Sequence, residues 1–164
     1  MVNVSLYFNL NEHLKLSKYR IYDIGKNSNY FDENFMEDSF MRNTVESYTE
    51  VTNILLELIK VYGSDFKISL SVSGFVVELM NKHHPQLLEN FSKLAKTGNV
   101  EFVLEPYYNS ISSLYSEDEF LEQVNMQKEV IKKYFGCECV ILRNTELIYS
   151  NSLSSVFLKT GVKG

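Results

Sequence analysis

The sequence has no tryptophan, only two prolines and two cysteines, and no long uninterrupted apolar run. A membrane helix needs roughly 20 apolar residues, so a spanning segment is not expected. In the first residues apolar and polar side chains alternate as in a strand, whereas a secretory signal has a basic start followed by an apolar core. We therefore expect no secretory signal and a cytoplasmic protein. Cys137 and Cys139 lie two residues apart, which suits an ordinary structural disulfide poorly, so we expect both to be reduced.

Positive charge is also scarce. The chain has 16 Lys and Arg against 21 Asp and Glu, a formal net charge of −5. No positive field is available to hold a phosphate backbone or an anionic membrane surface, so neither nucleic acid nor a membrane is an expected partner. His83 and His84 have no acidic or cysteine ligand at usable spacing, so no metal is expected, and no cofactor is expected either.

Apolar and aromatic residues, by contrast, are abundant. Apolar residues make up 45% of the 164 residues and aromatic residues 13%, with 11 Tyr and 11 Phe. This composition excludes disorder, and a chain of this length buries about 70% of the surface that its unfolded form exposes. We expect one folded domain over residues 1–164, with no second domain.

Strand and helix patterns alternate along the chain. Period-two apolar patterns and helical stripes predict strands at residues 2–10, 66–72, 100–104 and 139–142, and helices at 42–62, 75–81, 85–96, 116–135 and 152–159. Residues 15–40 show no convincing period and are expected to form a long loop. Because parallel strands need a crossover that is usually a helix, the pattern predicts an α/β fold of parallel (β/α) units, the front part of a larger barrel.

Polar residues follow the predicted strands, at the end where parallel α/β folds place their chemistry. Two carboxylates, Glu105 and Glu146, follow neighbouring strands, and amide and tyrosine side chains accompany them. Acids can transfer protons or attack, amides bind hydroxyls and rings stack on sugars, so these residue types suit a carbohydrate site. A structural alternative remains for each acid: Glu146 can cap a turn or pair with Arg143, and Pro106 imposes an extended geometry on Glu105.

Six short segments, in order along nearly the whole chain, carry a more specific signal. They are VSLYF (4–8), YDIG (22–25), YFD (30–32), GNVEF (98–102), EPYYNS (105–110) and RNTELIY (143–149). Together they closely resemble the amino-terminal part of the α-amylase-like family-57 glycoside hydrolases, and the last segment is the most specific of the six.

The resemblance implies an incomplete seven-stranded (β/α) barrel and a retaining mechanism on α-glucans, by hydrolysis or by glucan transfer. It implies that Glu146 is the catalytic nucleophile. The residues expected to bind substrate are Asn11, Glu105, Tyr108, Asn109, Arg143 and Asn144. The acid/base Asp of the family belongs to a later barrel segment, beyond Gly164. Tyr107 and Tyr108 are adjacent, so we expect one to face the core and the other the cleft.

Two positions depart from the family pattern. The His-Gln-Pro of the first motif stands here as Asn11-Glu12-His13, and Asn109 occupies the histidine position of the second motif. Each change keeps hydrogen bonding but loses a proton-linked charge. A second hypothesis is therefore an inactive descendant that binds glucan or a protein partner. A third is a structural fragment that self-associates, or is completed by further chain, through unpaired strand edges.

Overall fold

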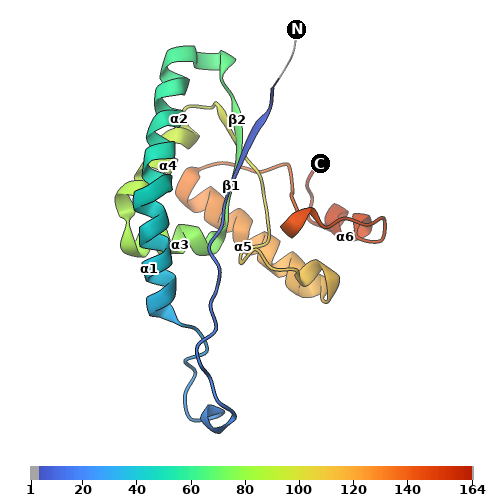
Figure 1. The fold of residues 1–164 in the computed structure, drawn as a ribbon. Coiled ribbons are helices and arrows are strands. Elements are labelled where there is room, and N and C mark those ends of the chain that lie inside the picture. The colour runs from blue at the N-terminus through green and yellow to red at the C-terminus, as the bar shows by residue number, and fades with distance from the viewer. Residues whose placement is uncertain (1–3, 164) are drawn as a thin grey trace.

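The computed structural model describes residues 4–163 and has a parallel three-stranded sheet at its centre (Figure 1). The strands are β1 (Leu6–Leu10), β2 (Ile68–Val72) and β3 (Val100–Phe102), in the order β1-β2-β3. The helices are α1 (Glu33–Asn43), α2 (Thr49–Tyr62), α3 (Gly74–His83), α4 (Pro85–Lys96), α5 (Glu117–Phe135) and α6 (Ser154–Lys159). The predicted α/β class with parallel strands is confirmed.

After α5 the chain returns to the edge of β3. The backbone N–H of Leu104 donates to Ile141 at 2.9 Å and that of Arg143 donates to Leu104 at 2.8 Å, which makes a parallel bridge between Leu104 and Leu142. This single bridge replaces the four-residue strand expected at 139–142. Neighbouring carbonyls of an extended segment point to opposite sides, and the carbonyl of Val140 accepts from Lys163 at 2.7 Å. Each new segment therefore joins the outer edge of the previous one.

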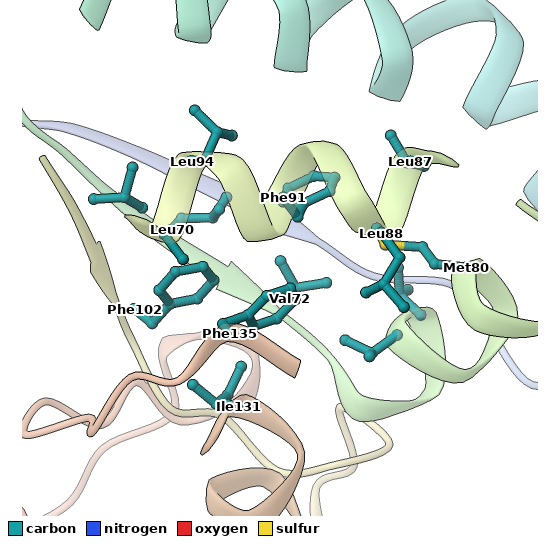
Figure 2. Close-up of a cluster of buried hydrophobic side chains, with 14 of the residues drawn as sticks. Leu70, Val72, Met80, Leu87, Leu88, Phe91, Leu94, Phe102, Ile131 and Phe135 are labelled. Carbon is teal, nitrogen blue, oxygen red and sulfur yellow. The ribbon is translucent and has the colours of Figure 1, made fainter. Parts of the chain in front are cut away.

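One face of the sheet is apolar and carries the core (Figure 2). Its strand residues pack against α4 and α5, and the rings of Phe102 and Phe135 stack with centroids 4.8 Å apart. Burying each such large apolar side chain stabilises the fold by about 1.5–3 kcal/mol. The labelled side chains in Figure 2 are Leu70, Val72, Met80, Leu87, Leu88, Phe91, Leu94, Phe102, Ile131 and Phe135.

The opposite face of the sheet is polar. The register places Tyr7 beside Ser69, Asn9 beside Ser71, and Ser69 beside Glu101. Parallel sheets are usually apolar on both faces because helices cover both. Here the helical core fixes which side of each strand is buried in hydrocarbon, and the alternation of side chains then directs the polar residues to the other side.

The helical run begins earlier than the sequence pattern indicated. The prediction of a loop through residues 15–40 is wrong at its end, because α1 begins at Glu33 and the Asp32 carboxylate caps it by accepting from the N–H of Phe35 at 3.1 Å. Only Met36 and Phe40 of α1 are buried, so its apolar stripe is too sparse to show a helical period.

Other boundaries differ by a few residues. A π-helical turn, Thr44–Tyr48, joins α1 to α2 within the predicted helix 42–62. The first strand begins at Leu6 instead of residue 2, although residues 1–3 lie outside the described part, and the last helix begins at Ser154. The predicted helix 85–96 matches α4, and α5 begins one residue after its cap, Ser116. Across residues 4–163, no helix is long and apolar enough to cross a membrane.

The start of α3 leaves no room for a side chain at Gly74. A Cβ placed there would lie 2.1 Å from Cε2 of Tyr107, whose ring is buried. We therefore expect Gly74→Ala to lower the free energy of unfolding by about 1–3 kcal/mol through overpacking. In a Tyr107→Ala background the same change should cost much less, which urea unfolding of the four proteins measures as a double-mutant cycle. An equal cost in both backgrounds would contradict the steric explanation.

Candidate active site

A polar cluster lies at the carboxyl end of the polar sheet face; its serine and its glutamate are buried, while its other members are half-buried or exposed. Its members come from β1 and the residues after it, from β2, from the residue after Leu104, and from the segment that bridges to Leu104. We call it the Glu105 cluster, and it consists of Tyr7, Asn9, Asn11, Ser71, Glu105 and Arg143. Three of the residues proposed from the sequence, Asn11, Glu105 and Arg143, are thus brought together.

Glu105 is fully buried at the centre of this cluster. Its Oε2 lies 3.9 Å from Nη1 of Arg143, close enough for an ion pair but too far for a hydrogen bond. Neither atom has a hydrogen-bond partner within residues 4–163. The amide of Asn11 is assigned with its nitrogen toward Glu105, because the opposite orientation would turn its oxygen toward acceptors alone; so assigned, it donates to Oε1 of Glu105 and to the carbonyl of Leu10, each at 3.1 Å. The carboxyl group of Glu105 therefore interacts with the rest of the cluster through Asn11 and Arg143.

Burial raises the pKa of the Glu105 carboxyl from 4.5 to about 7. Arg143 opposes this rise most strongly, followed by the polar side chains of Asn11 and Ser71. The group is therefore close to half protonated at neutral pH and can hold or release a proton there.

The remaining members of the cluster support Arg143 and Asn11 from the polar sheet face. The Tyr7 hydroxyl lies 2.6 Å from Oγ of Ser71, which donates to Oδ1 of Asn9 at 3.0 Å. The Arg143 guanidinium lies 5.5 Å from the centre of the Tyr7 ring, within cation–π range. Sequence reasoning missed Tyr7 and Ser71, although strand alternation places both on the face that carries Asn9.

Glu146 lies on a strained turn just beyond this cluster in the chain. Glu146 and Leu147 both have positive φ, 53° and 56°, at a cost of about 1–3 kcal/mol each for non-glycine residues. Asn144 holds the turn by donating to the carbonyl of Ile148 and to Oγ of Ser113, both at 2.9 Å. The Glu146 side chain is exposed and forms no hydrogen bond or ion pair with residues 4–163, while Arg143 pairs with Glu105. Backbone strain of this kind is concentrated at functional sites.

The loop after β3 places the other expected binding residues. Asn109 has a φ of 51°, and its N–H donates to the carbonyl of Pro106 at 2.8 Å, which forms a tight turn. Tyr107 is 3% exposed and faces the core, whereas Tyr108 is 40% exposed, as expected for adjacent residues. Tyr108 and Phe75 have ring centroids 6.5 Å apart and line an open groove of about 590 Å³. Tyr108 and Asn144 do not join the Glu105 cluster.

The histidine and cysteine pairs lie outside this site. His83 Nδ1 is 3.1 Å from Glu37, and His84 caps α4 by accepting from the N–H of Leu87 at 3.1 Å. Cys137 and Cys139 are free. Within the described residues, no three His, Cys, Asp or Glu side chains are grouped as a metal site would require.

The raised pKa of Glu105 makes stability depend on pH. The unfolded carboxyl loses its proton near pH 4.5 and the folded one near pH 7. Between these values the folded state binds more protons, so this contribution to stability is complete below about pH 4.5 and is lost as the pH rises through 7.

We therefore expect the wild type to lose up to about 3 kcal/mol of stability relative to Glu105→Gln between pH 4.5 and 8, because the amide does not titrate. Urea unfolding across this range measures the difference. Glu101→Gln, which changes an exposed acid of β3 and keeps Glu105, is the matched control and should lose stability with rising pH as the wild type does. A constant difference between wild type and Glu105→Gln across the range would contradict the assignment.

The model of glycosyl hydrolase family 57 matches residues 6–163. A Methanocaldococcus jannaschii protein that bears an alpha-amylase name is 33% identical over 166 residues, which cover 98% of this chain and 34% of that protein. The crystal structure of 4-alpha-glucanotransferase from Thermococcus litoralis superposes with a TM-score of 0.72 at 19% identity, over 97% of this chain and 22% of its own. A family-57 branching enzyme from Thermococcus kodakaraensis superposes with a TM-score of 0.64 at 12% identity, over 96% of this chain and 38% of its own.

The two structural likenesses show the fold, and this chain spans well under half of each of these proteins. The family model, however, covers nearly all of the described residues, and the M. jannaschii relative covers almost the entire chain at 33% identity. The resemblance seen in the sequence is confirmed: the chain belongs to glycosyl hydrolase family 57.

Proposed function

We propose that this chain supplies the nucleophile and part of the substrate-binding surface of a retaining site that hydrolyses or transfers α-glucan chains. The observation that carries the proposal is Glu146, an exposed acid on a strained turn at the end of the fourth parallel segment, in a chain of this family. Relatives bear the names alpha-amylase and 4-alpha-glucanotransferase. A carboxylate in this position is free to approach a substrate, since no neighbouring cation among residues 4–163 holds it.

In the proposed reaction a carboxylate oxygen of Glu146 attacks the anomeric carbon. The glycosidic C–O bond breaks as the departing oxygen takes a proton from the acid/base Asp that the family resemblance places in a later barrel segment. Water or a second sugar hydroxyl, giving its proton back to that Asp, then cleaves the ester to Glu146 and releases the glucosyl group with retention. Arg143 presents N–H donors and Asn11 an amide oxygen near the strand ends, while Tyr108, Asn109 and Asn144 belong to the loops around them. Glu105 is fully buried, so we assign it to substrate binding through Asn11 and Arg143.

We further propose that the fold is the front part of an incomplete seven-stranded (β/α) barrel. The successive addition of segments at one edge supports this, since Leu104 bonds Ile141 and Lys163 bonds Val140. Within residues 4–163, β1 pairs only with β2, so its other edge offers a place for self-association or for further chain. A neutral glucan partner agrees with the net charge of −5, which provides no positive field for a polyanion.

An inactive glucan-binding descendant is the second candidate. Asn11 and Asn109 favour it, because each amide stands where the family motif has an ionisable imidazole. An amide retains hydrogen bonds to sugar hydroxyls but takes no part in proton transfer.

A 5-fluoro-α-glucosyl fluoride tests the nucleophile directly. Fluoride is a good leaving group, so bond formation at Glu146 with departure of fluoride needs no acid catalyst. We expect mass spectrometry to find one fluoroglucosyl adduct on the peptide that contains Glu146. Glu146→Gln should slow labelling on the order of 10³-fold or more, because the amide is a far weaker nucleophile. Glu138→Gln, at another exposed glutamate, should label like the wild type.

Calorimetry with maltohexaose separates the two candidates. Binding without an adduct would overturn the catalytic proposal and support the inactive descendant. Neither binding nor an adduct would overturn both, and an adduct at a different carboxylate would contradict the assignment of Glu146.

A further inference from the structure

Glu12 is a second buried carboxylate, and the proposed reaction does not use it. It is 8% exposed, and its Oε1 accepts two hydrogen bonds, from Nδ2 of Asn43 at 2.7 Å and from the hydroxyl of Tyr48 at 2.8 Å. Ser39 Oγ donates more weakly to Oε2 at 3.4 Å. Side chains from α1 and the following turn therefore converge on one residue of the loop after β1.

The π-helical turn brings these donors together. Tyr48 is the last residue of the turn Thr44–Tyr48, directly after the end of α1 at Asn43. A π turn adds one residue relative to an α-helix, which rotates the next helical residues by about 100° around the axis. Burial and the Glu12 carboxylate both raise the pKa of Tyr48, so its hydroxyl keeps its proton and remains a donor.

Glu12 directly follows Asn11, and the two side chains engage opposite partners. Asn11 donates to Glu105 in the polar cluster, while Glu12 accepts from the helical layer. We propose that Glu12 is a positioning residue, which fastens the loop after β1 to the helices and so holds the Asn11 amide against Glu105. The effect of Glu12 on substrate binding rests on the proposed function, whereas its effect on the contact between Asn11 and Glu105 does not.

A purely structural role makes a different prediction. If Glu12 only stabilises the fold, its loss lowers stability but leaves the contact between Asn11 and Glu105 unchanged. The hydrogen bond from Asn11 keeps the pKa of Glu105 lower than burial alone would make it. If Glu12 positions Asn11, loss of Glu12 removes this hydrogen bond and the pKa of Glu105 rises. Besides this amide and Ser71, the groups that face Glu105 are Arg143 and Tyr7, and Glu12 contacts neither.

The test is a ¹³C NMR titration of the Glu105 carboxyl carbon, assigned by its loss in Glu105→Gln. We expect Glu12→Ala to raise the midpoint by about 0.5 pH unit or more, the effect of losing a hydrogen bond to the charged form. Removing the negative charge of Glu12 would by itself lower the midpoint, so a rise cannot come from charge. Glu12→Gln keeps an oxygen that both donors can reach, and its midpoint should stay at or below that of the wild type.

An Asn11→Ala background completes the design. There Glu12→Ala should cause no further rise, because the hydrogen bond is already absent. An unchanged midpoint in Glu12→Ala, or an equal rise with and without Asn11, would overturn the proposal. If Glu12→Ala does not fold, Tyr48→Phe removes one donor and should raise the midpoint by a smaller amount; no rise in that variant would also overturn it.

Labelling by the fluoroglucosyl fluoride then separates the two proposals. Glu12→Ala should raise the half-saturating reagent concentration at least threefold and leave the limiting rate nearly unchanged, as expected when binding alone is weakened. A shifted titration without any wild-type labelling would support the role of Glu12 while contradicting the proposed function. Labelling of the wild type together with an unshifted titration in Glu12→Ala would support the proposed function while contradicting the role of Glu12.

Discussion

The buried carboxyl group of Glu105 sets the requirements that the rest of this site meets. Removing an ionised carboxylate from water costs several kcal/mol, and Arg143, 3.9 Å away, compensates only in part. The group therefore titrates near pH 7. Its neighbours come from β1, β2 and the segment that bridges to Leu104, so the cluster exists only when those segments lie parallel and in register with the chain that leads out of β3. The electrostatics of the site thus depend on the topology of the sheet.

That topology depends in turn on a sheet whose two faces differ. The helices pack on one face, where Leu70 and Phe102 join the core, and this packing leaves Ser71 and Asn9 on the other. A one-residue shift of β2 would exchange its faces, burying serines against α4 and exposing leucine. The hydrophobic effect therefore orients the polar residues without acting on them directly.

Much of this arrangement could be predicted from the sequence, but not every part of it. Pro85 at the start of α4 and Gly136 after α5 are local signals, and the helices from α2 onward were predictable because their caps and stripes are local too, whereas the sparse stripe of α1 gave no such signal. The convergence of Asn11, Glu105 and Arg143 followed from parallel strand order alone. The contact of Glu12 with Tyr48 did not, since it depends on a π turn that leaves no mark in apolar periodicity. The positive φ of Glu146, a residue without glycine's freedom, is likewise imposed by tertiary contacts such as those of Asn144.

The amide at position 11 has an electrostatic consequence beyond hydrogen bonding. An imidazole beside Glu105 could take up a proton and, as a cation, stabilise the ionised carboxylate, which would lower its pKa. Asn11 donates at 3.1 Å but brings no charge, so among the described residues Arg143 is the cation that stabilises the ionised form of Glu105. The carboxyl then keeps a proton to higher pH, and the cluster carries less fixed negative charge at the place where we propose that a neutral sugar binds. The departure from the family motif therefore changes the charge of the group beside Glu105 while keeping a hydrogen-bond donor there.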